Sequence, residues 1–501
     1  MTLAPFAATP GGAWLVLAVL VPVAGMLASF ALGGRNAERV ALVGMGVSLV
    51  VAIVIAWRVA ASGAPLSYAL GGFAPPLGIA LRADGLSVIM LVMAAIVMLA
   101  AGLYARANFA TPAGTDEARA PFAFWILVQA IAASLNLLFL GSDLFNLYVG
   151  LELLTFAAAP LVCLDGRPET LKAALRYLVF ALFGSMFYLL GVGLIYGAFG
   201  TLDFALLAER MRATPPVWLG AGLMTAGLLA KTALFPLHLW LPPAHANAPP
   251  AASAILSGLV VKGSFVVILR IWFFALPQLQ IAPATTILAA LGSAAILFGS
   301  LMALRQARLK LLIAYSTLAQ IGYLFLVFPL AAGAHAWGAD AWSGGIMQIV
   351  AHAFAKSAMF LSAGLVYEAL GHDKIAGLTG AAREMPMTFF ALGLGGLSLM
   401  GLPPSGGFAA KWLLIVASVE SGQWLWAVVM LAGGVLAAGY LYRILQPAMA
   451  DAAIALKARP ERAREAIPLA LAVIAVLLGF MPASFFSLMQ LGRPILAGVA
   501  P

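Results

Sequence analysis

The stretch 229-LAKTALFPLHLWLPPAHANAPPAASAILSGLVVK-262 decides how this chain folds. It is apolar enough to lie in a bilayer, yet it contains five prolines and carries a lysine near each end, Lys231 and Lys262. Each proline removes a backbone donor and clashes with the preceding turn, so a continuous helix is interrupted there. Freed backbone groups at membrane depth are tolerated only where protein or water covers them. The stretch therefore predicts a broken helix buried inside a larger helical membrane bundle.

The composition of the whole chain is typical of a polytopic membrane protein. Of 501 residues, 64% are hydrophobic and 9% are charged, and the mean hydropathy is +1.05. A soluble domain of this size does not carry so apolar a composition. The first apolar run, 12–33, lacks a basic start and a small-residue cleavage site, so we expect a first span rather than a signal peptide. The single cysteine, Cys163, excludes disulfide frameworks, and the five histidines show no metal-ligand spacing. We predict no cofactor, redox centre or metal on this chain.

Apolar periodicity predicts an all-α fold of about fourteen transmembrane helices. The predicted segments are 12–33, 40–60, 84–105, 121–140, 143–164, 174–198, 217–236, 250–275, 284–304, 310–330, 342–369, 386–420, 424–442 and 467–489.

Basic residues gather in alternate connections of this arrangement. The connections after odd-numbered segments hold Arg35, Arg39, Arg106, Arg119, Arg167, Lys172, Arg176, Arg305, Arg308, Lys310, Lys374, Arg383, Arg443, Lys457, Arg459, Arg462 and Arg464. The opposite connections hold only Arg58, Arg82, Arg210, Arg212, Arg270 and Arg493. The positive-inside rule then places the basic connections in the cytoplasm of a bacterial cell and both termini on the outer side of the inner membrane. The net charge of +9 thus reflects topology and not nucleic-acid binding.

A second break is predicted in 394-LGGLSLMGLPPSGGFAAKW-412, where Gly401 and Pro403-Pro404 interrupt an apolar run. The two breaks fall in the seventh and twelfth segments, as a repeat of five helices would place them. Paired interrupted helices are the best sequence pointer to an ion pathway in a transporter. We divide the chain into N-terminal helices, two five-helix repeats, and a basic loop with a last helix, over 1–120, 121–275, 284–442 and 443–501.

Charged residues inside apolar segments are the candidate functional groups, since a charge at the centre of a membrane helix costs ~2.5–3.5 kcal/mol on insertion scales. Glu152 lies in 143-DLFNLYVGLELLTFAAAPLVC-163, and we expect it to pair with Lys231. In such a pair the proton affinity of each group depends on its partner, which makes a switch for proton transfer. A structural ion pair that locks two helices together is the competing interpretation.

Four further groups extend the expected proton relay. Lys262 lies deep in its segment, although snorkelling to the interface is an alternative. His352 and Lys356 are one helical turn apart and share a face, and a neutral imidazole can accept and donate a proton at once. For His352 the alternative is a satisfied core histidine. Lys411 follows the second break and would end the relay, unless it anchors its helix near the interface.

Other polar residues have two interpretations each. His238 and His245 flank the first break and either bond freed carbonyls or pass protons. Asp143, near a helix end on the outer side, is expected to cap a helix, and a gate is the alternative interpretation. The run 310-KLLIAYSTLAQIGYLFL-326 carries polar side chains that either line a hydrated path or join helices. These side chains belong to Tyr315, Ser316, Gln320 and Tyr323.

The motifs resemble the antiporter-like membrane subunits shared by respiratory complex I, membrane-bound hydrogenases and Mrp cation/proton antiporters. The resemblance runs from about residue 84 to 445 and is densest in 229–262 and in 309-LKLLIAYSTLAQIGY-323. It implies fourteen helices with two inverted five-helix repeats. It also implies a glutamate on helix five, lysines on helices seven and eight, and a charged residue on helix twelve. These roles correspond to Glu152, Lys231, Lys262 and Lys411.

Some positions depart from the pattern of the family. Pro243 and Asn247 stand where relatives often carry acidic residues, which bears on hydration or subunit contacts. Lys411 in place of a carboxylate argues against the middle antiporter-like subunit of complex I, and the lack of a long lateral C-terminal helix argues against the distal one. The stretch 70-LGGFAPPLGIALRADGLSVIMLV-92 resembles the D-type subunit of Mrp antiporters.

The sequence therefore predicts a proton-translocating membrane subunit of a multisubunit monovalent cation/proton antiporter, similar to the D-type subunit of the Mrp class. Its expected partners are other membrane subunits, H⁺ with Na⁺ or K⁺, and the lipid bilayer. Four alternatives stay open: a proton-pumping membrane-arm subunit of a NADH–quinone oxidoreductase, hydrogenase or formate-oxidising complex; a subunit for proton-coupled uptake of inorganic carbon; a structural membrane subunit held by ion pairs; and a lone small-molecule carrier, for which no large polar cavity signature marks a substrate site.

Overall fold

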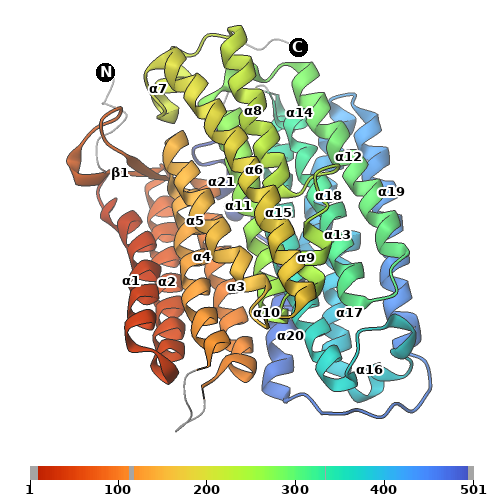
Figure 1. Ribbon diagram of the computed structural model, residues 1–501. Coiled ribbons are helices and arrows are strands. Elements are labelled where there is room, and N and C mark those ends of the chain that lie inside the picture. The colour runs from red at the N-terminus through yellow and green to blue at the C-terminus, as the bar shows by residue number, and fades with distance from the viewer. Residues whose placement is uncertain (1–8, 112–117, 333–334, 495–501) are drawn as a thin grey trace.

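The computed structural model describes residues 9–111, 118–332 and 335–494, which form one bundle of long helices (Figure 1). Twelve helical segments among these residues are long and apolar enough to cross a membrane. The two strands present there, β1 (Leu66–Ala69) and β2 (Ala80–Ala83), pair as an antiparallel hairpin with Leu66 opposite Ala83. The predicted class, an all-α polytopic membrane protein, is confirmed.

The twelve segments are α1 (Ala13–Leu32), α2 (Gly34–Ser62), α3 (Gly85–Phe109), α4 (Arg119–Leu140), α5 (Leu144–Val162), α6 (Pro168–Phe199), Pro250–Ala275, α12 (Ala282–Leu304), Leu309–Ala331, α15 (Ala336–Leu370), α19 (Trp424–Ala448) and Arg462–Phe480. Three of them are composite. Their parts are α10 (Pro250–Ile255), the π-helical turn η2 (Leu256–Val260), α11 (Val261–Leu269) and the π-helical turn η3 (Arg270–Ala275); α13 (Leu309–Phe325) and α14 (Val327–Ala331); and α20 (Arg462–Leu477) with η6 (Leu478–Phe480). The remaining short elements are η1 (Leu70–Gly72), α7 (Phe204–Arg210), η4 (Pro277–Leu279), η5 (Ile375–Gly377), α16 (Ala381–Glu384) and α21 (Ala483–Gln490).

Both breaks lie where the sequence predicts them. The first separates α8 (Pro215–Thr232) from α9 (Leu241–Asn247), and the second separates α17 (Pro386–Met400) from α18 (Gly406–Glu420). In each case the first helix ends at a residue with left-handed backbone, Ala233 with φ 59° and Gly401 with φ 81°. The count of fourteen crossings, the two inverted repeats and the division of the chain into four parts stay predictions.

Burial is uneven across the bundle. The most apolar windows of Pro250–Ala275 and of α15 are 100% buried, whereas those of α1 and α2 are 28% and 33% buried. Large apolar side chains on outer helices, such as Phe30 and Phe183, are exposed. A soluble monomer rarely exposes contiguous apolar surface on that scale, but a bilayer covers it. The core of the molecule therefore lies around Pro250–Ala275 and α15.

Alternate connections lie at opposite ends of the bundle, as the charge pattern predicts. The β1–β2 hairpin and α7 are at one end, here called the hairpin end, and α16 and the α19–α20 connection are at the other (Figure 1). This second end, the basic end, carries the ion pairs Arg308–Asp373, Arg383–Asp451 and Arg459–Glu384. The predicted position of both termini on the outer side concerns residues outside the described ranges.

Candidate functional site

Glu152 and Lys231 form an ion pair between α5 and α8, as their positions in the sequence predict. The Lys231 Nζ lies 3.2 Å from Glu152 Oε1, and the two side chains are 5% and 15% exposed. Lys231 also donates to Thr155 Oγ1 at 2.9 Å, and the Ser185 hydroxyl donates to Glu152. Both charges are therefore held by hydrogen bonds as well as by each other.

Small residues bring the helices of this pair together. Gly184 on α6 packs on Gly227 on α8 so closely that a Cβ at Gly184 would lie 2.5 Å from the Gly227 carbonyl oxygen. Close backbone approach through small residues is typical of helix contacts in membranes. It places Ser185, the next residue on α6, beside Glu152.

Lys262 is fully buried in the core segment. Its side chain is 0% exposed, which rules out snorkelling in this structure. The ammonium donates to the carbonyl of Ser257, a residue of the π-helical turn η2. A π-bulge widens the helix by one residue, and such bulges often mark functional sites. Among the described residues no carboxylate forms an ion pair with Lys262.

His352 and Lys356 lie one turn apart on α15. Lys356 donates to the carbonyl of Ile313 at 3.0 Å and to the hydroxyl of Ser316, both on α13. His352 is 1% exposed, and both ring nitrogens lack a hydrogen-bond partner within the described ranges. Its electrostatic neighbours include Lys262, Lys356 and Lys411. His352 is thus a buried group without a hydrogen-bond partner in the described part of the chain, and several lysines are its electrostatic neighbours.

Lys411 on α18 folds back onto the second break. Its Nζ donates to the carbonyls of Leu399 at 2.6 Å and Met400 at 3.2 Å, which the end of α17 leaves free. The ammonium also lies 4.3 Å from the centre of the Tyr323 ring, an arrangement that attracts a cation to the face of the ring. Lys411 therefore binds the broken backbone rather than anchoring its helix in the interface.

Pairs of hydroxyls lie at residues next to these groups in the chain. Thr232, next to Lys231, donates to Ser264 on α11 at 2.9 Å. On the other side of Lys262, the hydroxyls of Ser257 and Thr317 are 2.9 Å apart. Thr317 is the neighbour of Ser316, which binds Lys356.

Amides connect to the backbone that binds Lys411, and a tyrosine lies beside one of them. Gln348 on α15 donates to Gln320 on α13 at 2.9 Å, and Gln320 donates to the Leu399 carbonyl at 3.0 Å. That carbonyl also accepts from Lys411. The Tyr440 hydroxyl lies beside Ser316 and Gln320. We call this set of polar side chains the polar axis: Glu152, Lys231, Lys262, His352, Lys356, Lys411 and the neighbouring residues Thr232, Ser257, Ser264, Ser316, Thr317, Gln320, Gln348 and Tyr440.

The other predicted site residues lie in different environments in the structure. His238 packs beside Phe235 and Phe298, with ring centroids 5.5 and 5.1 Å away. His245 is 0% exposed, and both of its nitrogens lack a partner among the described residues. Tyr315 is only half-buried and joins no hydrogen bond of the axis. Asp143 accepts from the backbone N–H groups of Phe145 and Asn146, so the predicted helix cap is confirmed.

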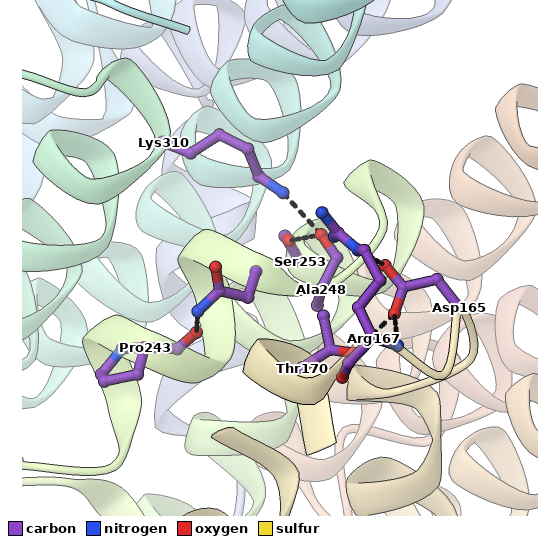
Figure 2. A network of polar contacts seen from close by, with 8 residues as sticks. Asp165, Arg167, Thr170, Pro243, Ala248, Ser253 and Lys310 are labelled. Atoms are coloured by element: carbon purple, nitrogen blue, oxygen red, sulfur yellow. Dashed lines mark hydrogen bonds and ion pairs between the residues drawn. The ribbon is translucent and has the colours of Figure 1, made fainter. Parts of the chain in front are cut away.

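Two basic residues that the charge pattern assigns to connections are buried instead. Lys310 is 7% exposed in the first turn of α13 and donates to the Ala248 carbonyl (Figure 2). Arg270 is 4% exposed in η3 and forms a bidentate pair with Asp84, the N-cap of α3. A long side chain near a helix end can turn inward, and sequence position alone does not reveal this. Among the described residues no group of three or more His, Cys, Asp or Glu could hold a metal ion.

Comparison with known proteins identifies the family. Residues 141–437, more than half of the chain, match the family described as NADH:quinone oxidoreductase/Mrp antiporter, transmembrane. The chain belongs to this family.

Members of the family with different assigned roles are similar to this chain. The N subunit of the NADH-quinone oxidoreductase of Desulforudis audaxviator is 35% identical over 77% of this chain and 76% of its own. The D-type subunit of the Na⁺/H⁺ antiporter of Alkalihalophilus pseudofirmus is 31% identical over 84% of each chain. Among solved structures, a chain of the Mrp complex from Dietzia sp. DQ12-45-1b superposes with a TM-score of 0.85 at 26% identity, covering 97% of this chain and 98% of that one.

Proposed function

We propose that this family member is the proton-translocating membrane subunit of a multisubunit monovalent cation/proton antiporter, similar to the D-type subunit of the Mrp class. The observation that carries the proposal is the polar axis, which runs from the Glu152–Lys231 pair through the buried core to Lys411. A purely structural subunit would not need these buried charges. Buried ion pairs add little net stability, and three of the axis lysines have no carboxylate partner among the described residues. The relatives named as D-type antiporter subunits support the same assignment.

In the proposed mechanism protons move along Lys231, Lys262, His352, Lys356 and Lys411. Lys231 is the group under direct control of a carboxylate, so separation of the Glu152–Lys231 pair changes the proton affinity of Lys231. The lysines further along are held by carbonyl and hydroxyl dipoles, which leaves each amine free to give up its proton when water bridges to the next group. His352 can accept at one nitrogen and donate from the other. Movement of the Glu152–Lys231 pair thereby gates each step along the axis.

The partners in this proposal are other membrane subunits of one complex in a bacterial inner membrane. Solved structures of similar chains come from multisubunit membrane complexes, which supports such an assembly. The exchanged ion would be Na⁺ or K⁺, in line with relatives named for either cation.

A second candidate function is a redox-driven proton pump, because the N subunits of NADH-quinone oxidoreductase and F420H2 dehydrogenase are also similar to this chain. The polar axis would serve either function, since the energy source would lie on other subunits.

The test is antiport by the complex expressed from its own operon in a strain without its sodium/proton antiporters. Everted vesicles would be energised, and collapse of the pH gradient on addition of Na⁺ or K⁺ recorded for the wild type, Lys231→Ala and Lys172→Ala. Lys172 is an exposed lysine of α6 and serves as the matched control. We expect collapse in the wild type and in Lys172→Ala, and none in Lys231→Ala. A fully assembled wild-type complex that responds to neither cation would overturn antiport in favour of the redox-driven pump.

A further inference from the structure

A cavity opens at the basic end beside the first break. It has a volume of about 350 Å³ and is lined by Asp165, Arg167, Asn247, Lys310, Tyr367 and Asp373, among others. These residues come from connections and helix ends that are far apart in sequence. The cavity is large enough for several waters, which need only a small polar volume each.

Lys310 lies at the wall of this cavity and binds the broken backbone. Its Nζ donates to the Ala248 carbonyl at 2.5 Å, and Figure 2 shows the side chain reaching across from α13 to the end of α9. Pro249 and Pro250 follow Ala248 and supply no N–H donor of their own. The Ser253 hydroxyl, 3.2 Å from the same carbonyl, is the other nearby donor.

The carboxylates around the cavity are already engaged with other groups. Asp165 binds Arg167 at 2.6 Å and the Thr170 hydroxyl at 2.5 Å, and Asp373 binds Arg308 at 3.0 Å. Burial raises the pKa of Asp165, but the hydrogen bonds from Thr170 and Arg167 outweigh it and leave that pKa below its ordinary value. Asp165 therefore stays ionised at neutral pH. Within the described ranges the Lys310 ammonium is bound by a backbone carbonyl and by no carboxylate, as are Lys262 and Lys411 on the polar axis.

His245 is a buried electrostatic neighbour of Lys310. It is fully buried with both ring nitrogens unpartnered among the described residues. The Ser253 hydroxyl is 2.8 Å from its carbonyl and so spans the backbone between His245 and Ala248. His245 interacts electrostatically with Lys262, Lys356 and Lys310. His245 thus has both a lysine of the cavity wall and two lysines of the polar axis among its electrostatic neighbours.

We propose that Lys310 is a further proton carrier, the first group to take a proton from water in the cavity at the basic end, and that its bond to Ala248 ties this step to the first break. The proposal rests on the proton-transport function proposed above. A proton leaves a hydronium ion in the cavity and forms an N–H bond on the free amine. The ammonium later gives this proton to a water molecule near His245, and the neutral amine is regenerated.

The rival role for Lys310 is a structural cap that only holds the break, and the variants Lys310→Arg and Lys310→Gln separate the two. An arginine at this position would keep a charged donor that does not deprotonate, and a glutamine would keep a neutral donor that does not titrate. A proton carrier predicts that both variants lose proton transport by at least about tenfold, a modest share of what positioned acid–base groups contribute. Transport at the wild-type rate in either variant, with loss in Lys310→Ala alone, would show a cap and overturn the proposal. Lys374, exposed at the same end, provides the matched control variants Lys374→Arg and Lys374→Gln.

A second measurement does not depend on which energy source drives the complex. In a Cys163→Ser background, Lys310→Cys would be treated from the basic end with aminoethyl methanethiosulfonate, which restores a titratable amine, or with its trimethylammonium analogue, which carries a fixed charge. We expect both reagents to label position 310 and only the first to restore proton transport. Failure of either reagent to label would show that cavity water does not reach this position, and rescue by the fixed charge would show that titration is not required. Labelling is read by mass, so it stays informative if neither Na⁺ nor K⁺ drives transport.

Discussion

At the scale of single residues, the buried lysines differ in what holds their ammonium groups. Lys231 has a carboxylate partner, whereas Lys262, Lys356 and Lys411 donate to carbonyl and hydroxyl oxygens. A carboxylate changes the proton affinity of its partner far more than a neutral dipole does. We therefore expect the Glu152–Lys231 pair to control proton movement along the polar axis, and the other lysines to pass the proton on.

Neutralising the glutamate of this pair tests that control. Glu152→Gln keeps the size of the side chain and an oxygen for the Ser185 hydroxyl but leaves Lys231 without its counter-charge. We expect proton transport to fall by at least about tenfold, while assembly of the complex is unchanged. Rates in everted vesicles and subunit content on native gels would be measured together. Glu169→Gln, at an exposed glutamate of α6, should transport normally; equal rates in both variants would contradict the gating role.

The Asp84–Arg270 pair predicts that the stability of the fold decreases at acidic pH. Burial raises the pKa of Asp84, but the Arg270 guanidinium and the Ser87 N–H lower it more, so it lies below the ordinary value. A depressed folded pKa contributes stability that is present above the unfolded pKa of ~3.9 and is lost as pH falls through the folded value. Asp84→Asn leaves Arg270 buried without a counter-charge, which costs ~3–5 kcal/mol.

Thermal unfolding of the purified protein in detergent, from pH 7 down to pH 3, would measure this effect. Asp84→Asn should unfold at lower temperature than the wild type at pH 7, and the difference should shrink toward the acid end. Asp451→Asn breaks a pair whose carboxylate is 90% exposed and should change little at any pH. An unfolding temperature of Asp84→Asn equal to the wild type at pH 7 would refute the argument.

At the scale of elements, the two helix breaks position buried lysine side chains. The end of α17 supplies the carbonyls that bind Lys411, and the end of α9 supplies the carbonyl that binds Lys310. Prolines make the breaks visible in the sequence. The π-helical turn η2 that receives Lys262 contains no proline. It does contain Gly258, a poor helix former, but a single glycine does not predict a wide turn, which depends on the packing around it. The sequence also does not reveal that the Lys310 side chain turns inward. A lysine two residues after Arg308 looks the same as the other basic residues of that connection.

Gly401 offers a direct test of the second break. It has φ 81°, and a Cβ there would lie 2.7 Å from Cδ of Lys411. Gly401→Ala therefore adds left-handed strain of ~1–2 kcal/mol and also displaces the lysine. We expect reduced stability and a loss of proton transport.

Gly422→Ala is the control for that variant. Gly422 has φ 73°, but nothing lies within 4 Å of the position that a Cβ would take, so its substitution carries the strain without touching a lysine. It should lower the unfolding temperature and leave transport intact. Loss of transport in both variants would assign the effect to strain rather than to Lys411.

At the scale of the whole molecule, the alternation of basic connections predicts which segments share an end, and the arrangement of elements agrees with it (Figure 1). The charge pattern suffices for this because each crossing reverses the side of the next connection. It does not by itself reveal that Pro250–Ala275 and α15 are the buried centre while α1 and α2 lie at the edge. The mean hydropathy of these segments differs in that direction, with 2.0 and 1.5 for the two buried segments against 2.5 and 2.6 for α1 and α2.

The orientation of the bundle in the membrane can be measured with single cysteines in a Cys163→Ser background. Leu77→Cys, in the hairpin connection, replaces a side chain that is 93% exposed, and Asp451→Cys replaces one that is 90% exposed at the basic end. In intact cells a membrane-impermeant maleimide should label position 77 and not position 451. Everted vesicles should show the opposite, and a reversed pattern would place the basic end outside.

The ammonium–carbonyl bonds at the breaks also make proton movement visible in the infrared. The Leu399 carbonyl accepts from Lys411 at 2.6 Å and from Gln320 at 3.0 Å. A carbonyl bound to an ammonium vibrates at a lower frequency than one bound to a neutral amine. With carbon-13 in the leucine carbonyls, and Leu399→Ile to identify the band by subtraction, each departure of a proton from Lys411 should appear as an upward shift of one amide band. The backbone of the broken helix would then serve as a built-in spectroscopic probe of the charge on its lysine.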